Sequence, residues 1–101
     1  MTDRYLYRGL IRLHLLHHAA ARPVYGLAMI EELGRLGYRL SPGTLYPILH
    51  GLEKQGYLRS TVQRIGRTAR RIYRITSSGR RALDGAKRKV YELFGEMFLR
   101  R

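Results

Sequence analysis

Apolar side chains recur at every third or fourth position near the start of the chain, which is the spacing of one face of a helix. Tyr7, Ile11 and Leu15 form a second apolar stripe beside the first, as expected of a helix that packs on two bodies. Pro23 ends the segment because proline cannot continue the helical hydrogen bonds. The pattern predicts a helix over residues 3–21 with this first stripe: Leu6, Leu10, Leu13, Leu16 and Ala20.

A second helix is predicted over residues 26–36. Leu27, Ile30 and Leu33 recur on one side of it. Gly37 follows, and glycine readily adopts the left-handed conformation that ends many helices.

The stretch "LSPGTLYPILHGLEKQGYLRS" predicts a third helix, with Ser41 as N-cap and Pro42 as the first helical residue. Gly56 ends it. Pro47 leaves two alternatives: the regular helix starts nearer Thr44, or one backbone hydrogen bond is lost inside it. The buried stripe is formed by Leu45, Ile48, Leu49 and Leu52.

The period then changes from helix to strand. Residues 57–64 and 70–76 predict two strands joined by "IGRTA", and the inward positions are Leu58, Val62, Tyr73 and Ile75. Thr76 or Ser77 caps a last helix, whose apolar face consists of Leu83, Ala86, Val90, Leu93, Phe94, Met97 and Phe98.

The predicted fold is therefore mainly α with a small β-hairpin (α+β). Three helices followed by a basic two-stranded hairpin predict a winged helix-turn-helix, completed by a C-terminal dimerisation helix. We expect residues 1–76 to form the winged helix-turn-helix unit, whose first helix also takes part in dimer contacts. Residues 77–101 are expected to form the dimerisation helix.

Composition points the same way. With 101 residues one domain is expected, and the formal net charge of +13 favours a polyanionic partner. The absence of cysteine excludes disulfides and thiolate zinc sites. No apolar run reaches the ~18 residues of a membrane span. The apolar start is interrupted by Arg and His, so we reject a signal peptide and expect a cytoplasmic protein.

The third helix occupies the place of the recognition helix, whose N-terminal residues meet base edges in the major groove of DNA. Gly43 would let the backbone approach a phosphate, next to the free N–H groups of the helix start. The alternative to a DNA-binding role is that these residues form an ordinary solvent-exposed helix face with a capping serine. The candidate DNA-binding residues of this helix are Ser41, Pro42, Gly43, Thr44, Tyr46, His50 and Lys54, with Pro47 also facing out.

The hairpin carries a stronger signal. Eight arginines and no acid lie between Arg59 and Arg81. Like charges at a turn repel each other, which a phosphate surface would relieve. A solvated charged face normally mixes both signs. We predict that Arg67, at the tip, enters a minor groove, within this candidate set: Arg64, Arg67, Arg70, Arg71 and Arg74.

Three segments resemble the PadR family of bacterial transcriptional regulators: "PVYGLAMIEEL", "LSPGTLYPILHGLEKQGYLRS" and "RTARRIYRITSSGRRAL". They stand in the family's order over roughly residues 6–85, and the SPGTLYP core is specific. The resemblance implies a winged helix whose last helix builds a homodimer. It also implies a repressor at a palindromic operator, often released by a small ligand or a stress signal. This sequence has Ala69 where the wing often has Pro, and its last helix is short for the family.

The last helix has more apolar side chains than so small a core can cover, so we expect a two-fold dimer. Tyr5, Tyr7 and Tyr91 could line an effector site with Phe94 and Phe98, although such a stripe is more often core. The predicted interface contains Leu6, Leu10, Leu83, Val90, Leu93, Phe94, Met97 and Phe98.

Three other interpretations remain open. A basic RNA-binding or ribosome-associated protein fits the size and charge, but the sequence lacks the strands typical of single-strand RNA readers. His14 and His18 have a metal-compatible spacing, yet no acid joins them and no nucleophile–base pair is recognisable. We therefore expect that the protein is not an enzyme and that it binds no cofactor or metal. The amphipathic last helix could lie on a membrane, but a partner subunit explains its apolar face better. We therefore expect no membrane as partner. The partner that we expect is double-stranded DNA.

Overall fold

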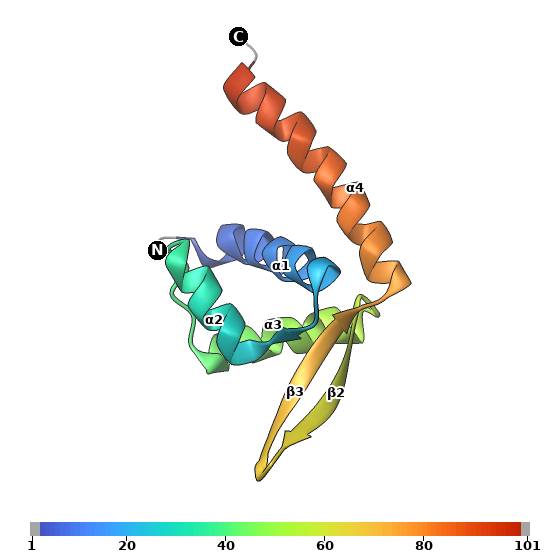
Figure 1. Ribbon diagram of the computed structural model, residues 1–101. Helices are drawn as coiled ribbons and strands as arrows, with labels where there is room; N and C mark the ends of the chain where they lie inside the picture. The colour runs from blue at the N-terminus through green and yellow to red at the C-terminus, as the bar shows by residue number, and fades with distance from the viewer. Residues whose placement is uncertain (1–2, 100–101) are drawn as a thin grey trace.

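The computed structural model describes residues 3–99, over which the chain forms four α-helices and a small antiparallel sheet (Figure 1). A π-helical turn, Gly95–Leu99, continues the last helix. The predicted class, mainly α with a small β-hairpin, is confirmed. The elements are α1 (Arg4–Ala21), β1 (Val24–Tyr25), α2 (Gly26–Arg35), α3 (Pro42–Lys54), β2 (Leu58–Ile65), β3 (Thr68–Ile75) and α4 (Ser77–Phe94).

The sheet has one strand more than the predicted hairpin. Its order is β1-β3-β2, with Val24 opposite Tyr73 and Tyr25 opposite Ile72. A strand of two residues is too short to show an alternating pattern, so the sequence did not reveal β1. This short strand attaches the root of the hairpin to the segment between α1 and α2.

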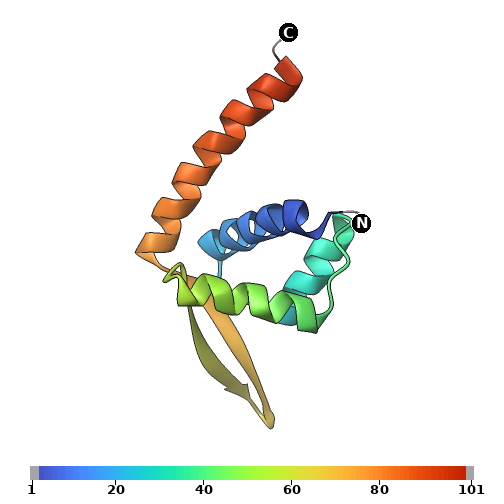
Figure 2. The ribbon, with the colours of Figure 1, turned by 180° about the vertical axis from the view of Figure 1, so that it is seen from behind.

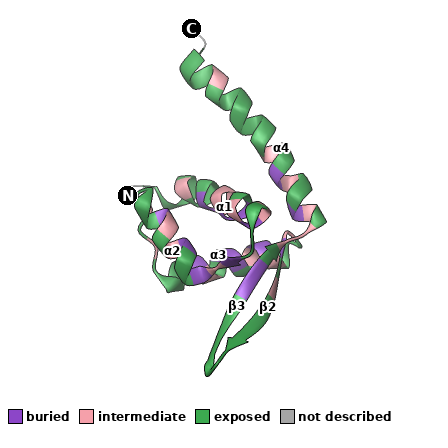
Figure 3. Ribbon diagram, in the orientation of Figure 1, coloured by how far each residue is buried: buried purple, intermediate pink, exposed green. Residues whose placement is uncertain are grey.

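The core lies between the three N-terminal helices and the root of the hairpin (Figure 3). The predicted inward positions Leu58 and Tyr73 are buried. Val62 was predicted to be inward and is 55% exposed, because the hairpin extends beyond the helices that could cover it. Ile72, on the other face of β3, is buried instead. The buried helix residues include Ile11, Leu15, Leu16, Leu33, Leu45, Ile48, Leu49 and Leu52.

The helix ends follow from local chemistry. Gly37 and Gly56 have φ angles of 95° and 84°, so both helix-ending glycines adopt the left-handed conformation. Asp3 caps α1 by accepting hydrogen bonds from the backbone N–H groups of Tyr5 and Leu6. Ser41 occupies the N-cap of α3, but its side chain makes no capping hydrogen bond. Because α3 begins at Pro42, Pro47 lies inside it and one backbone bond is lost, which is the second of the two alternatives.

Helix α4 starts in the body of the protein and then projects away from it (Figures 1 and 2). Thr76 caps it by accepting a hydrogen bond from the Gly79 N–H at 2.9 Å. Leu83 was predicted to lie in the dimer interface, but it is 5% exposed and belongs to the chain's own core. It sits on the first turns of α4, which still contact the body. Within residues 3–99, no helix combines the length and apolar character that crossing a bilayer requires.

Candidate nucleic-acid interface

The start of α3 presents a short polar face. Thr44 is exposed, and its hydroxyl lies 3.3 Å from the Ser41 hydroxyl. A Cβ atom added to Gly43 would meet only the Ser41 Oγ at 3.7 Å, so packing within the chain does not require glycine there. Pro42, Pro47 and Lys54 are exposed as well. The first turn contains no acid, so its free N–H groups face no negative side chain of that turn.

Tyr46 does not belong to this face, and the prediction that it points outward is wrong. The start of α3 lies over the start of α2, and the Tyr46 ring packs onto Gly26. A Cβ atom on Gly26 would lie 2.7 Å from Tyr46 Cε1, closer than real contacts allow. Tyr46 is half-buried against the core. Its role in the structure is therefore to set α3 against α2.

His50 is exposed one helical turn beyond Pro47. Its ring meets the buried Tyr73 ring edge-on, with centroids 6.4 Å apart. The Tyr73 hydroxyl is buried and has no hydrogen-bond partner among residues 3–99. Burial raises the pKa of Tyr73, Arg71 opposes this rise, and Glu53 and Tyr46 add to it. The buried, neutral Tyr73 ring thus packs against the exposed His50 ring.

The hairpin, which we call the wing (residues 58–75), carries arginines that make no polar contact within the chain's described part. Gly66 has a φ of 62°, which closes the turn before Arg67. Arg64, Arg67 and Arg74 are exposed, and none of them makes a side-chain hydrogen bond or ion pair within the described part of the chain. Their charge therefore remains available to a partner.

Two wing arginines are engaged within the chain. The Arg70 guanidinium lies 4.5 Å from the centre of the Tyr25 ring, a cation–π contact. Tyr25 in turn donates its hydroxyl hydrogen bond to Gln63 on β2 at 2.9 Å. Arg71 donates to the Ser60 hydroxyl at 3.0 Å. Both side chains stay exposed, so they combine an internal contact with a free edge.

Glu53 connects α3 to the wing, and sequence reasoning missed it. Its carboxylate accepts hydrogen bonds from the Ser60 backbone N–H at 3.0 Å and from the Ser60 hydroxyl at 2.9 Å. Arg71 completes the chain of contacts on Ser60. Glu53 is the one acid between Glu32 and Asp84, and this isolation in a basic region was the signal that could have found it.

A second surface is apolar. Leu6 and Leu10 on α1 are exposed, and so is the outer part of α4. Among the predicted interface residues other than Leu83, the exposed fraction ranges from 43% at Leu10 to 67% at Phe98. Phe94 and Phe98 contact each other with ring centroids 5.1 Å apart. Of the predicted interface residues, all but Leu83 are thus exposed in the single chain: Leu6, Leu10, Val90, Leu93, Phe94, Met97 and Phe98.

The histidines of α1 form an aromatic group. The His14 and His18 rings stack with centroids 6.4 Å apart, and His14 also meets Tyr38 edge-on at 5.5 Å. Within residues 3–99, no group of three or more His, Cys, Asp or Glu side chains is placed to hold a metal ion. Burial, and then His18 and His17, lower the pKa of His14 below its usual 6.5.

A helix-turn-helix followed by a basic wing defines the class of winged-helix DNA-binding regulators. Within that class, residues 15–85 match the model of the transcriptional regulator PadR-like family, and the chain belongs to this family.

Known relatives support the assignment. The chain is 50% identical over 90 residues to the transcriptional regulator Rv3488 of Mycobacterium tuberculosis, which covers 89% of this chain and 84% of that protein. A PadR family transcriptional regulator from Eggerthella lenta is 32% identical, with a TM-score of 0.78 over 88% of this chain and 79% of that one. A Streptococcus transcriptional regulator, 20% identical, shares the fold with a TM-score of 0.81 over 93% and 94% of the two chains.

Proposed function

We propose that this regulator is a homodimeric repressor that binds an inverted repeat in double-stranded DNA. One observation carries the proposal. A wing with free arginines is joined, through Glu53 and Ser60, to a helix whose exposed start, residues 41–44, has no acid in its first turn. A helix of this kind enters the major groove, and basic side chains beside it neutralise phosphates. Thr44 and His50 are the side chains we assign to base edges. Arg64, Arg67 and Arg74 are assigned to the backbone and minor groove.

The dimer follows from the apolar surface on α1 and α4. Exposed Leu, Val, Met and Phe side chains on one helix bury best against a second copy of the same surface. In this proposal residues 77–101 form the dimerisation helix and residues 1–76 the DNA-binding unit, with Leu83 counted in the core. Residues 1–2 and 100–101 lie outside the described residues. Two recognition helices related by a two-fold axis require an inverted repeat, with half-sites about one helical turn (~10 bp) or more apart.

Three expectations complete the proposal. Transcriptional regulators need no catalytic machinery, so we assign the chain no enzymatic activity, cofactor or metal. A small effector that releases the repressor is expected from the family resemblance, and the aromatic side chains between α1 and α4 would line its site. The location would be cytoplasmic, where the DNA is.

The proposal is tested by selecting binding sequences from a random duplex pool and measuring affinities over a salt series. We expect an enriched inverted repeat and much weaker binding to single-stranded RNA. Arg67→Ala should weaken binding to operator and random duplex alike and lower the salt slope by about one unit per lost phosphate contact, so by about two for the dimer. Thr44→Ala should cost about 1–3 kcal/mol on the operator and little on random DNA.

Other outcomes would contradict specific parts of the proposal. Preference for single-stranded RNA would favour the RNA-binding alternative. A footprint on a single asymmetric half-site at stoichiometric protein would exclude the two-fold arrangement. Equal losses on operator and random DNA for Thr44→Ala would show that this face only positions the protein.

A further inference from the structure

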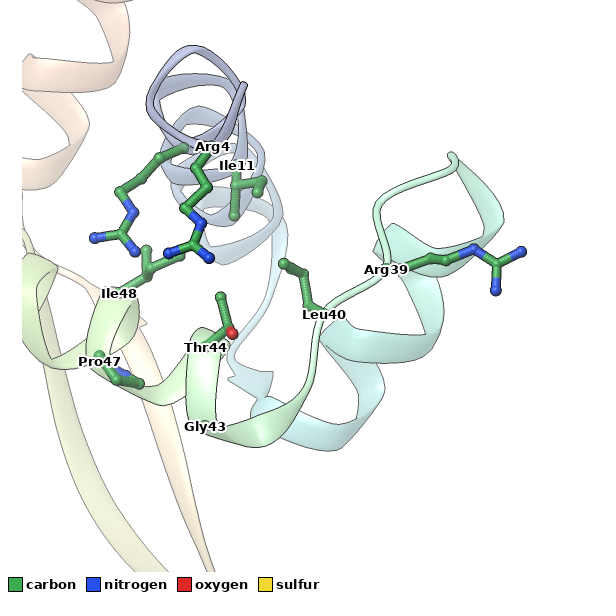
Figure 4. Close-up of a pocket in the computed structure, with 9 residues that line it drawn as sticks. Arg4, Ile11, Arg39, Leu40, Gly43, Thr44, Pro47 and Ile48 are labelled. Atoms are coloured by element: carbon green, nitrogen blue, oxygen red, sulfur yellow. The ribbon is translucent and has the colours of Figure 1, made fainter. Parts of the chain in front are cut away.

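A pocket of about 410 Å³ lies between the start of α1 and the start of α3 (Figure 4). Arg4 and Arg8 line it from α1, and Gly43 and Thr44 line it from α3. Ile48 contributes to its apolar wall. The pocket therefore borders the first turn of the helix that we assign to the major groove.

The pocket is strongly cationic. Its lining includes three arginines and no acid. Arg4 points from α1 toward Thr44 and Ile48, whereas Arg39 points away from them (Figure 4). Arg4 and Arg8 are four residues apart on α1, so their side chains share one face of the helix. Two like charges at this spacing destabilise a helix slightly, and that cost is relieved when an anion binds between them.

The charges of both arginines are unpaired in the described part of the chain. Within residues 3–99, Arg4 and Arg8 make no side-chain hydrogen bond or ion pair. Arg12, one turn further along α1, donates instead to Gln55. The adjacent acid, Asp3, accepts hydrogen bonds from the N–H groups of Tyr5 and Leu6 at 3.1 Å, which occupies one of its carboxylate oxygens.

We infer that Arg4 and Arg8 form a phosphate site that holds the DNA backbone beside the groove occupied by α3. The inference rests on the proposed function, because it takes α3 to be the groove-binding element. Guanidinium forks match the oxygens of a phosphate, and a duplex that reaches Thr44 brings its own phosphates to the adjoining pocket. The protein then contacts the DNA backbone on both sides of α3. The wing makes the contacts on one side and the start of α1 makes them on the other.

The test compares charge-removing variants with a matched control. Arg4→Gln, Arg8→Gln and the double variant remove the pair but keep a good helix former. Arg88→Gln removes the same charge from the exposed outer part of α4. Affinity for the operator and for a random duplex is measured over a salt series. The salt slope should fall by about 0.9 for each lost phosphate contact. Because the proposed dimer carries each substitution twice, the fall should be about two for a single variant and about four for the double variant, on both duplexes. The Arg88→Gln slope should equal the wild-type slope.

Inorganic phosphate separates the two sources of the ligand. Thermal unfolding is measured in phosphate and in chloride at equal ionic strength, for the wild type and the double variant. Stabilisation by phosphate that the double variant loses, together with its lower DNA slope, supports the site. The same stabilisation with an unchanged DNA slope would assign the pocket to a free anion and overturn the assignment to DNA.

The remaining outcomes also decide the matter. A double variant that binds DNA with the wild-type slope overturns the inference while leaving the proposed function intact. An equal loss in Arg88→Gln shows a general effect of net charge and overturns it as well. Failure of the wild-type protein to bind any duplex removes the proposed function and this site together.

Discussion

Both ends of α4 carry apolar side chains, but only the side chains near its start are buried. Near its start, Gly79 and Leu83 are buried, and a Cβ atom on Gly79 would lie 2.8 Å from Ile75 Cγ1. Towards its end, Leu93 and Met97 are 53% and 61% exposed. We call residues 4–83 the body and residues 84–99 the arm. One continuous helix thus belongs to a folded core at one end and to no core of this chain at the other.

The difference shows what an apolar stripe can and cannot tell. The stripe predicts that a face will be covered, and only the three-dimensional reach of the neighbouring elements decides what covers it. In the body, α1 and the sheet root lie beside α4. The arm extends past them, and we propose that a second copy of the chain covers its face. Substitutions in the arm should therefore affect association, and substitutions in the body should affect folding.

The largest effect is expected from placing charges on the arm. In the double variant Leu93→Glu and Met97→Glu, each change occurs twice across a two-fold axis, and each buried side chain of this size is worth about 1.5–3 kcal/mol. The variant should sediment as a folded monomer at micromolar concentration. Arg88→Glu, on the arm but outside the apolar face, should leave the dimer intact.

A substitution in the body should instead affect folding and leave association unchanged. Leu83→Ala should lower the free energy of unfolding by about 2–5 kcal/mol even in the monomeric background. A wild-type chain that sediments as a monomer would contradict the assignment of the arm to a dimer. A double-glutamate variant that is unfolded would place its leucine and methionine in the core instead.

Two glycines six residues apart on α4 sharpen the same comparison. Gly79 packs against the Tyr57 carbonyl, whereas a Cβ atom on Gly85 would meet nothing within 4 Å. In the monomeric background, Gly79→Ala should destabilise the fold by about 1–3 kcal/mol. Gly85→Ala should stabilise it by about 0.5–1 kcal/mol, because alanine is the better helix former. Urea unfolding of both variants checks the contrast, and equal destabilisation would show that the body extends beyond Leu83.

Two glutamates allow a smaller comparison. Glu53 is half-buried and accepts hydrogen bonds from Ser60, while Glu92 on the arm faces Lys89 at 3.5 Å with both side chains largely exposed. Glu53→Ala should lower the free energy of unfolding by about 1–3 kcal/mol, since it leaves a part-buried N–H unpaired. Glu92→Ala should change it by less than about 0.5 kcal/mol. Chemical unfolding in the monomeric background measures both, and similar values would show that the contact between α3 and the wing is dispensable.

Much of the fold could be predicted because helix and strand periods are local properties. The leucines of α3 identify its buried face, and Gly37 and Gly56 mark the helix ends. The short strand β1 could not be predicted, because pairing between distant segments creates it. Val62 was misplaced for the same reason: alternation predicts two faces of a strand, but not how far the covering layer extends.

The candidate interface was predicted less completely. The charged residues of the wing were identified because eight like charges without an acid are visible in the sequence. The internal contacts of Arg70 and Arg71 were not, since both depend on side chains from other elements. Tyr46 was assigned to the outer face because helical spacing alone does not show that Gly26 leaves room for its ring. Whether the remaining residues bind DNA stays a prediction.

The smallest expected effect is a pH dependence that resides in the body. Burial, with His18 and His17 nearby, lowers the pKa of His14 in the folded chain below its usual 6.5. The unfolded chain then binds a proton more readily than the folded chain, so stability should fall as the pH drops through about 6.5. His14→Gln should reduce this loss between pH 7.5 and 5.5, above the range in which carboxylates titrate. Urea unfolding in the monomeric background measures it, because association no longer contributes there. If the pH dependence were the same with and without His14, the decrease would have to come from other groups. If the pH dependence were present in the wild type but absent in the monomeric variant, it would come from the arm and its partner rather than from the body.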